Sequence, residues 1–302
     1  MTVLVMYSKP DAIELYCPGG KKSLLSVSYA VADTRTMVGN SAVGCDQRDK
    51  VHCIRFERTS MKEVILGFDV LVSGCGAAPM CDKVIKVVDD VVYSIANTMP
   101  LGRGGDVRYA QHSLYTSLSN AYEKEMGELN RLASTTSKYL AAIDYQVVVT
   151  FGEYMVMFTQ HGMVDFKKPY TISNEIKSPV MFFGGAARMQ AKAAWNAYNR
   201  HTRFPSHFTP PAPVVTYSAE LKDVLPALIM HLQSEYVDMF KVMAFSVFDA
   251  EPDAVGPNMS YYISVMLESK NTSLLMYGRT DGMPLTNADE LFSDLDGAAR
   301  LA

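Results

Sequence analysis

The chain has 302 residues, of which 48% are hydrophobic and 20% are charged, and its formal net charge is −4. That length and hydrophobic content are enough for a sizeable buried core, in one large domain or two ordinary ones. The weak net charge argues against a nucleic-acid-binding protein, because phosphate binding needs a clustered basic face. We therefore expect no nucleic-acid partner.

The cysteines and histidines indicate free thiols and no metal site. The cysteines are odd in number and include no C-x-x-C pair, which disfavours a disulfide framework or a zinc site. They are Cys17, Cys45, Cys53, Cys75 and Cys81. None of the six histidines stands at helical spacing from another. We expect free thiols in a reducing compartment, and we predict neither a metal nor any other cofactor.

The hydropathy pattern indicates a soluble protein. No apolar run approaches the roughly 20 residues that a membrane helix needs, and no secretory signal opens the chain. We therefore expect no membrane partner, and a location in the cytoplasm or in a particle assembled there.

The first part of the chain is predicted to form strands, because short apolar runs alternate with turn residues. A loop is expected over 39–46, and a polar connection at 57–62 should join the last two strands as a hairpin. The predicted strands are 3–6, 12–16, 24–32, 51–56 and 64–72.

The period then changes to that of a helix. From Pro79 onward the apolar residues fall on one helix face, and a proline suits the first helical turn. A second helix is predicted over 107–133. Strands follow at 143–151 and 154–160, joined by a tight turn, and a further short strand is predicted at 180–183.

Two more helices and three strands complete the predicted pattern. The helices are expected at 187–198 and 219–240, with Pro226 starting or kinking the second one. The strands are expected at 241–248, 261–267 and 273–277.

Strands and helices in this order predict an α+β fold, a four-layer αββα sandwich with two antiparallel sheets between helix pairs. The chain shows neither an internal repeat nor a flexible linker. We therefore expect one domain over 1–277, with insertions, followed by an acidic tail over 278–302 that is free to move.

Three short phrases stand in a fixed order in the first quarter of the chain. They are A-D-T-R-T at 32–36, D-K-V at 49–51 and S-G-C-G-A-A at 73–78, and Thr2 stands directly behind the initiator methionine. These phrases place an Asp turn at the end of a strand, a Lys at the start of the next strand and a Gly/Ala-rich turn before a helix. In this order they resemble the first half of proteasome and HslV-type subunits. These are the threonine branch of the N-terminal-nucleophile hydrolases. The resemblance is clearest over 32–95 and continues by element order to about 200.

The resemblance implies a threonine-type amidase site. Thr2 would be the nucleophile, with its own α-amine as general base. Lys50 would lower the pKa of that amine as a neighbouring positive charge, and Asp33 would hold Lys50 in place. The S-G-C-G-A turn, including Gly74 and Cys75, would supply backbone N–H groups to an oxyanion.

The chain also departs from the family pattern. The family's supporting serine in a G-S-G-S turn falls at Gly184–Ala187, where no hydroxyl is present. A later Asp-x-x-Ser-Gly phrase is matched by a segment that keeps Asp253 but puts Gly256 in place of the serine. The segment from Thr2 to Asp33 is longer than in the family, which predicts an insertion or an extended sheet over 7–24.

Two functions remain open from the sequence. The first is a self-assembling threonine peptidase subunit in rings, with or without an ATPase partner. The second is a catalytically inactive structural or interaction protein of the same fold, within a larger or viral particle alongside other particle proteins. Both predict a homo-oligomer. A serine- or cysteine-dependent hydrolase has little support, since no G-x-S-x-G is present and Cys75 is better explained as a small buried residue.

Overall fold

A computed structural model describes most of the chain. The described residues are 3–16, 22–38, 42–45, 49–60, 63–99, 106–135, 144–166, 179–201, 207–208, 221–267, 271–283 and 285.

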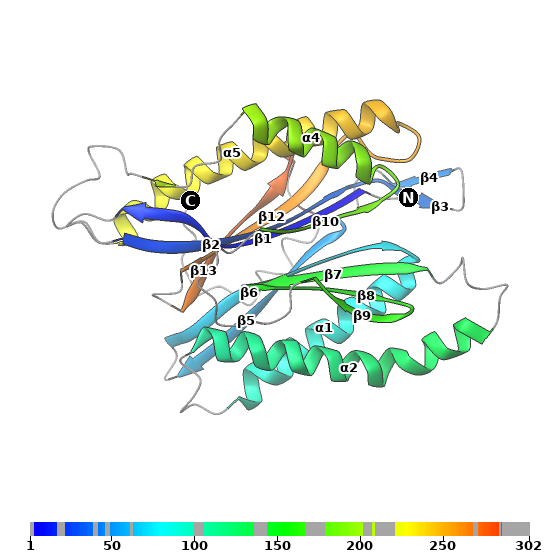
Figure 1. Cartoon of the computed structure of the whole chain (residues 1–302), viewed down its shortest axis with the longest axis horizontal. Helices are drawn as coiled ribbons and strands as arrows, with labels where there is room; N and C mark the ends of the chain where they lie inside the picture. Colours follow the sequence, from blue (N-terminus) through cyan, green and yellow to red (C-terminus); the bar gives the residue numbers. More distant parts are fainter. Residues whose placement is uncertain are drawn as a thin grey trace.

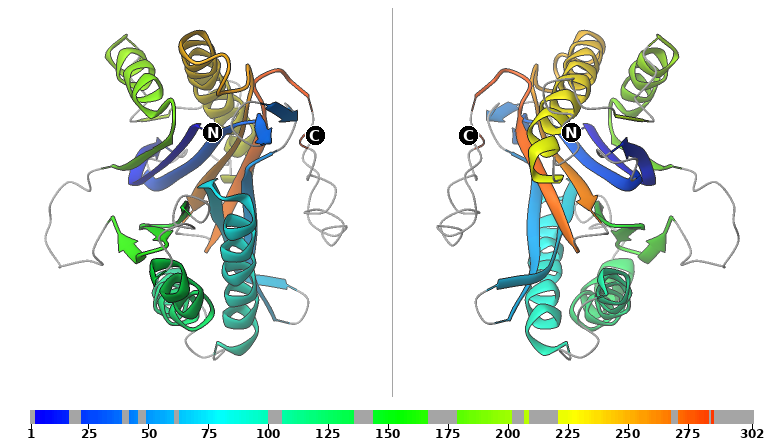
Figure 2. Two further views of the ribbon diagram at one scale, coloured as in Figure 1. Left: turned by 90° about the vertical axis from the view of Figure 1, so that its right-hand side faces the viewer. Right: turned by 90° about the vertical axis from the view of Figure 1, so that its left-hand side faces the viewer.

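Two sheets lie face to face, and a pair of helices covers the outer face of each (Figures 1 and 2). This is the predicted α+β four-layer αββα order, which is therefore confirmed. The second sheet and the main path of the first are antiparallel; among the described strands only the two-residue strand β11 runs parallel to its neighbour, β1.

The first sheet combines strands from both ends of the described chain. In spatial order its strands are β10 (Val180–Gly185), β1 (Val3–Tyr16), β2 (Lys22–Asp33), β12 (Met259–Leu267) and β13 (Thr272–Arg279), with β11 (His207–Phe208) beside β1. Its outer face carries α4 (Arg188–His201) and α5 (Leu221–Ala250).

The second sheet is built from consecutive strands. Their order is β5 (Val51–Ser60), β6 (Glu63–Gly76), β7 (Tyr145–Phe151), β8 (Tyr154–Thr159) and β9 (Gly162–Asp165). Its outer face carries α1 (Ala78–Thr98) and α2 (Val107–Thr135). A separate hairpin consists of β3 (Thr36–Val38) and β4 (Ala42–Cys45).

The alternation of side chains along each strand creates three apolar layers. On β1, Val3 and Val5 pack in the layer under α4 and α5, whereas Leu4 and Met6 pack between the two sheets. This is the period of two expected for a strand that is covered on both faces. A third cluster fills the space between the second sheet and its helices. No helix in the described ranges is long and apolar enough to cross a membrane.

The long segment before Asp33 is an extended hairpin. The two strands predicted at 3–6 and 12–16 are one strand, β1, which pairs with β2 from Leu4 opposite Ala32 to Tyr16 opposite Lys22. The register shifts between Lys9 and Ile13. Such a bulge lets one strand bend without ending. The extra length is therefore sheet rather than an inserted element.

One predicted strand is wrong. The segment 241–248 belongs to α5, which continues to Ala250. Its buried side chains, Phe240, Met243, Ala244 and Val247, recur at the helical spacing of three and four residues, so they face the sheet from one side of the helix. The apolar content of this segment suggested a strand because short apolar runs do not distinguish the two structures.

Several boundaries also differ from the sequence-based expectation. The segment 39–46, predicted as a loop, contains β4, and β9 was not predicted. At the other end, β13 continues past the predicted start of the tail to Arg279, and Leu285 is buried between the two sheets. The rest of the predicted tail, 286–302, lies outside the described residues.

Candidate functional site

Asp33 and Lys50 form an ion pair between the two sheets. The Lys50 ammonium lies 3.0 Å from Asp33 Oδ1 and 3.1 Å from Oδ2. The Asp33 side chain is fully buried and that of Lys50 is 12% exposed. Asp33 ends β2 in the first sheet and Lys50 directly precedes β5 in the second, so the pair joins the sheets at one end. Two of the residues singled out from the sequence are thus in direct contact.

The remaining acceptor sites of Asp33 are used by backbone N–H groups. The N–H of Val3 donates to Oδ1 at 2.8 Å, and the N–H of Arg35 donates to Oδ2 at 3.1 Å. Gly256 donates a longer bond of 3.4 Å to Oδ2. A buried carboxylate is stable in this setting because a positive charge and several donors replace its water. Asp33 therefore fixes the beginning of β1 and the Lys50 side chain together.

The turn that carries Asp253 packs closely on the Asp33 turn. A Cβ atom on Gly256 would lie 3.1 Å from both the Cβ and the N of Arg35. The Arg35 guanidinium donates to the carbonyl of Pro252 and lies 6.0 Å over the Phe248 ring. The position matched to the family's serine therefore has no room for a side chain unless Arg35 moves. Asp253 itself is exposed on this turn, unlike the fully buried Asp33.

The S-G-C-G-A segment is the end of a strand, which corrects its prediction as a turn. Ser73 to Gly76 pair with β7, from Val148 to Tyr145, and α1 begins at Ala78. Gly76 has φ +109°, and a Cβ there would lie 2.3 Å from the carbonyl oxygen of Asp144. The Ala77 N–H donates to that same oxygen at 2.8 Å. The N–H of Ala77, the last in the predicted oxyanion segment, is therefore already hydrogen-bonded to the residue before β7 and does not point to an oxyanion.

Ser73 has a role that the sequence did not indicate. Its hydroxyl donates to the carbonyl of Lys50 at 2.7 Å, and it pairs with Val51 in the sheet. The hydroxyl is fully buried there. Ser73 therefore holds the backbone from which the Lys50 side chain extends. In the sequence it was visible only as the first residue of a Gly-rich phrase.

Cys75 lines a pocket of about 290 Å³ beside the beginning of β1. The pocket lies between the end of β6 and the beginning of α4, and Gly185 on its wall pairs with Val3. Its lining residues are Cys75, Gly76, Asp144, Tyr145, Gln146, Gly185, Ala186 and Arg188.

The Cys75 thiol is protonated at neutral pH. Burial and, to a lesser degree, Asp144 raise its pKa to about 11, against a partial lowering by Lys50. The Sγ atom lies 3.7 Å from Gln146 Oε1. Because the thiolate is the reactive form, Cys75 is not an activated nucleophile. Gln146 was not singled out from the sequence, although an amide side chain in the largely apolar run Y-Q-V-V-V-T-F was a usable signal.

The Gly184–Ala187 segment requires glycine for local reasons. Gly185 has φ +87°, which side chains rarely adopt, and a Cβ on Gly184 would lie 2.6 Å from the Phe182 ring. Ala187 is fully buried directly before α4. The segment matched to the family's serine turn is thus the end of β10, where Gly184 and Gly185 pair with Leu4 and Val3, followed by a short turn before α4, and it carries no hydroxyl.

Thr2, the predicted nucleophile, lies outside the described residues, and Val3 is the first residue that the structure describes. Over the described ranges, no three His, Cys, Asp or Glu side chains are grouped so that they could hold a metal ion.

No protein-family model matches the chain, and no curated protein is significantly similar to it in sequence. Solved structures do match. HslV from Trypanosoma brucei has 10% identity and a TM-score of 0.39 over 86% of this chain and 98% of that one. Anbu from Hyphomicrobium sp. strain MC1 has 11% identity and a TM-score of 0.44 over 96% and 94%.

A third match is Anbu (ancestral beta-subunit) from Yersinia bercovieri. It has 9% identity and a TM-score of 0.41 over 90% of this chain and 86% of that one. Because these identities and TM-scores are low, the architecture of the chain is established by its own strand order and layers. The chain is thus similar to HslV and Anbu at a divergent level.

Proposed function

We propose that the chain is a proteasome-β/HslV-like self-assembling subunit in which Thr2, once Met1 is removed, cleaves amide bonds. One observation carries this proposal: Asp33 binds both the Lys50 ammonium and the N–H of Val3. One peptide bond joins Thr2 to Val3, which keeps their Cα atoms about 3.8 Å apart. Anchoring Val3 to Asp33 would therefore hold a threonine amine near Lys50.

The proposed reaction uses only groups of this chain and water. The neutral Thr2 amine accepts the proton of its own hydroxyl while Oγ bonds to the substrate carbonyl carbon. The tetrahedral intermediate collapses, the amide C–N bond breaks and the leaving amine takes the proton. Water then hydrolyses the ester by the same route and restores Thr2. Lys50 favours the neutral amine because a second positive charge nearby is unfavourable.

The test is intact mass followed by labelling. We expect the native protein to lack Met1 and to gain the mass of one β-lactone probe on Thr2. Thr2→Ala should not be labelled, and Lys50→Ala should be labelled at least about tenfold more slowly, because its loss removes the charge that keeps the amine neutral. Retention of Met1, or equal labelling of Thr2→Ala, would contradict a threonine hydrolase.

A second function is favoured by the missing donors. The segment Gly184–Ala187 carries no hydroxyl, Gly256 stands in place of the second serine, and the Ala77 N–H is already bonded. These features suit a catalytically inactive subunit that keeps the fold for assembly. In that case Thr2→Ala would leave assembly and the biological role unchanged. Loss of the role in a Thr2→Ala variant that still assembles would contradict this second function.

The proposed subunit is a homo-oligomer in the cytoplasm, in a ring or in stacked rings. Of the described cysteines, Cys53, Cys75 and Cys81 form no disulfide, as suits a reducing compartment. An ATPase or another particle protein is a further proposed partner. Sedimentation velocity of the purified chain tests the assembly, since a monomer at all concentrations would contradict it.

A further inference from the structure

The pocket beside Cys75 lies between the two sheets, and its walls come from both of them. Gln146 stands on β7 and Asp144 directly precedes that strand, so these two belong to the second sheet. Gly185 ends β10 and Arg188 begins α4, so these two belong to the first sheet and its helix layer. A volume of about 290 Å³ is at the lower limit of small-molecule sites. The pocket therefore suits a ligand about the size of one amino-acid residue.

Asp144 and Arg188 bring opposite charges to this pocket without neutralising each other. Both side chains are exposed. Within the described ranges, no ion pair joins the two to one another or to a further residue. The Arg188 guanidinium makes one long hydrogen bond of 3.5 Å, to the carbonyl of Gly185. The pocket thus offers a ligand one negative and one positive group.

Gln146 adds neutral hydrogen-bond donors to the same pocket. Its Oε1 lies 3.7 Å from Cys75 Sγ and accepts the S–H group. No described residue binds its amide nitrogen, which leaves two N–H donors for a ligand. A guanidinium and an amide both donate to a carboxylate, and a carboxylate such as that of Asp144 binds an ammonium. Together these groups match an α-amino acid, which carries one carboxylate and one ammonium.

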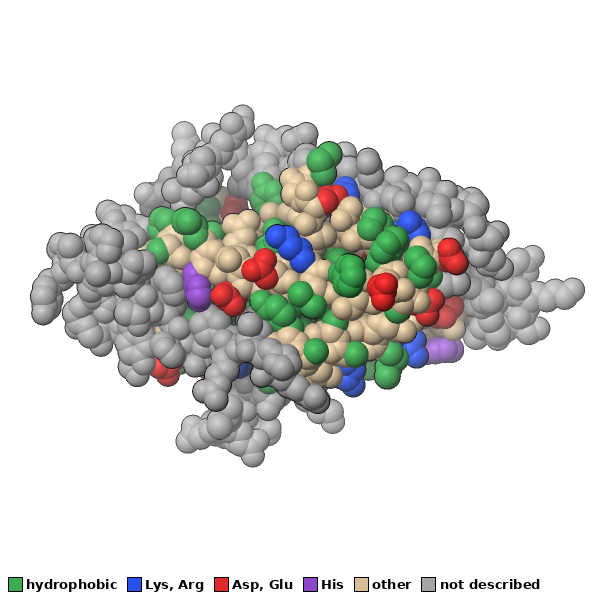
Figure 3. Space-filling view, turned by 90° about the horizontal axis from the view of Figure 1, so that it is seen from above, with side chains coloured by type: hydrophobic (Ala, Val, Ile, Leu, Met, Phe, Trp, Pro, Cys, Tyr) green, Lys and Arg blue, Asp and Glu red, His purple; other side chains and the backbone are tan. Residues whose placement is uncertain are grey.

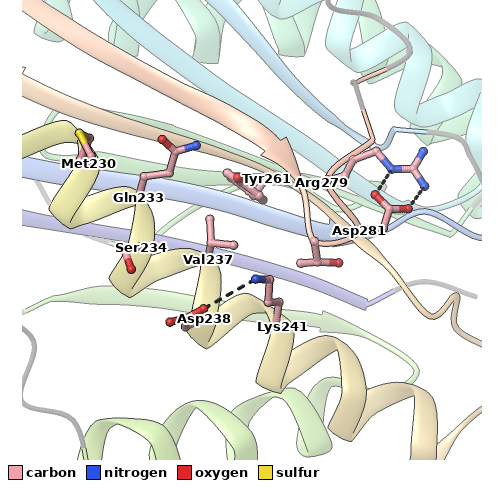
Figure 4. Close-up of a pocket in the computed structure, with 11 residues that line it drawn as sticks. Met230, Gln233, Ser234, Val237, Asp238, Lys241, Tyr261, Arg279 and Asp281 are labelled. Carbon is pink, nitrogen blue, oxygen red and sulfur yellow. Dashed lines mark hydrogen bonds and ion pairs between the residues drawn. The ribbon is translucent and has the colours of Figure 1, made fainter. Parts of the chain in front are cut away.

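A larger groove of about 560 Å³, between α5 and the turn after β13, has a different character (Figure 4). Its charged side chains already have partners. Arg279 is held by Asp281 at 2.9 Å, and Lys241 lies 3.8 Å from Asp238. On the face that α4 and α5 cover, basic and acidic side chains of the described residues are interspersed (Figure 3). The groove beside α5 is therefore a suitable place for control substitutions.

The position of the pocket beside Cys75 relates it to the candidate site. Gly185 on its wall pairs with Val3, and one peptide bond joins Val3 to Thr2. In the proposed reaction the acyl part of the substrate bonds to Thr2 through its own carbonyl carbon. A residue that adjoins the reacting bond and keeps a free α-carboxylate must therefore be the leaving group, which is the C-terminal residue of the substrate.

We propose that this pocket binds the C-terminal residue of a peptide substrate, with its α-carboxylate on Arg188 and Gln146. Breaking of the C–N bond releases that residue as an amine, which takes one more proton from water at neutral pH. The new ammonium is then stabilised by Asp144. The inference rests on the proposed function and gives it a substrate class: peptides with a free C-terminus, from which one amino acid is released.

Protection of the Cys75 thiol measures occupancy of the pocket without any reaction at Thr2. The Thr2→Ala chain is treated with a methanethiosulfonate reagent, with and without L-alanine, and peptide mass spectrometry follows Cys75. We expect saturable slowing, about tenfold when alanine is present at ten times its dissociation constant. Cys81 is buried on α1 and does not line the pocket, so its rate should not change. Equal slowing of Cys75 and Cys81, or no slowing by alanine at about 100 mM, would overturn the proposal.

Two analogues of alanine test which ends of the ligand are recognised. N-Acetylalanine has no ammonium and alanine methyl ester has no carboxylate. We expect each to bind about tenfold more weakly than alanine, because each loses one charge-assisted hydrogen bond. Protection by all three compounds at the same concentration would contradict recognition of an α-amino acid.

Substitutions then assign the two ends. Arg188→Gln should remove the preference for alanine over its methyl ester, and Asp144→Asn should remove the preference over N-acetylalanine. Because Asp144 also raises the pKa of the Cys75 thiol, rates with and without ligand are compared within each variant. Lys241→Gln in the groove beside α5 is the matched control and should change neither preference. The assignment is wrong if both preferences survive in the pocket variants, or if Lys241→Gln removes them.

The native chain tests the role of the pocket in cleavage. Trialanine with a free C-terminus should release alanine at least about tenfold faster than trialanine amide, and Arg188→Gln should abolish the difference. Equal cleavage of the two peptides would overturn the leaving-group role. Labelling of Thr2 without protection of Cys75 by alanine would leave the hydrolase proposal intact and contradict this one. Protection without labelling would support the amino-acid pocket and contradict the reaction at Thr2.

Discussion

Asp33 is a fully buried carboxylate that accepts bonds from Lys50 and from three backbone N–H groups. The sequence placed Asp33 and Lys50 together because both stood in recognisable phrases. The third donor, Gly256, could not be foreseen in this role, since it comes from a segment 223 residues away. Its phrase indicated a missing serine, whereas the structure shows a close approach in which a Cβ would lie 3.1 Å from the backbone N of Arg35, so that Arg35 would have to shift to admit a side chain.

The close packing of Gly256 against Arg35 leads to a prediction for a substitution at this position. Gly256→Ser would add back a hydroxyl, but its Cβ would press on the backbone N of Arg35. We expect it to lower the free energy of unfolding by about 1–3 kcal/mol, measured by urea denaturation. Gly127→Ser on α2 is the control. There a Cβ meets no atom nearer than 4.0 Å, and serine is favoured over glycine in a helix by about 0.5 kcal/mol.

The Cys75 thiol gives a second prediction at the scale of one residue. With a pKa of about 11 in the folded chain, against about 8.5 unfolded, alkylation of native Cys75 should rise with pH up to about pH 11. At pH 8 we expect it to be about a hundredfold slower than in urea. Peptide mass spectrometry across pH measures the profile. A native rate that levels off near pH 8.5 would show that the thiol is unperturbed.

The raised pKa of Cys75 also determines how the stability of the fold changes with pH. Because the folded-state pKa is raised, the protonated thiol contributes stability that is fully present below about pH 8.5. That contribution is lost as the pH rises toward about 11. Cys75→Ser should therefore reduce the alkaline loss of stability, which urea midpoints at pH 8 and pH 10 would detect.

At the scale of elements, patterns with a local cause were predictable and patterns with a tertiary cause were not. The α1 helix was identified from its apolar spacing and from Pro79, both of which act within the helix itself. The end of α5 was misread because the burial of Met243 and Val247 depends on the sheet beneath them. Likewise the strand character of Ser73 to Gly76 comes from pairing with β7, about 70 residues later in the chain.

A polar link between the sheets can be tested at this scale. Arg55 of β5 donates to Asp69 of β6 at 2.7 Å, and Ser264 of β12 donates to the same carboxylate at 2.7 Å. Arg55→Met would leave Asp69 buried without its charged partner and should cost about 3–5 kcal/mol of unfolding free energy. Arg55→Met/Asp69→Leu removes both charges and should cost less. If Arg55→Met/Asp69→Leu were less stable than Arg55→Met alone, the unpaired carboxylate of Asp69 would not be the source of the lost stability.

At the scale of the whole molecule, the first sheet joins the two ends of the described chain. Strand β12 pairs with β2 along its full length, from Met259 opposite Asp33 to Leu267 opposite Leu25. The second sheet is formed entirely by the sequence between these strands. The inner layer of Leu4, Met6 and Leu71 then packs the two sheets together. The first sheet is completed only after the chain has passed through the second, which favours one cooperative unit.

Two native reporters allow that cooperativity to be measured. Trp195, the only tryptophan in the chain, lies on α4 and donates to the Tyr29 hydroxyl of the first sheet. Cys53 is buried on β5 of the second sheet, where burial and Asp69 raise its thiol pKa. We expect tryptophan fluorescence and Cys53 alkylation to report the same urea midpoint within about 0.2 M, as in a two-state transition. Separate midpoints would show that the two sheets unfold independently, and the buried Asp33–Lys50 pair that joins them would then be too weak to couple the layers.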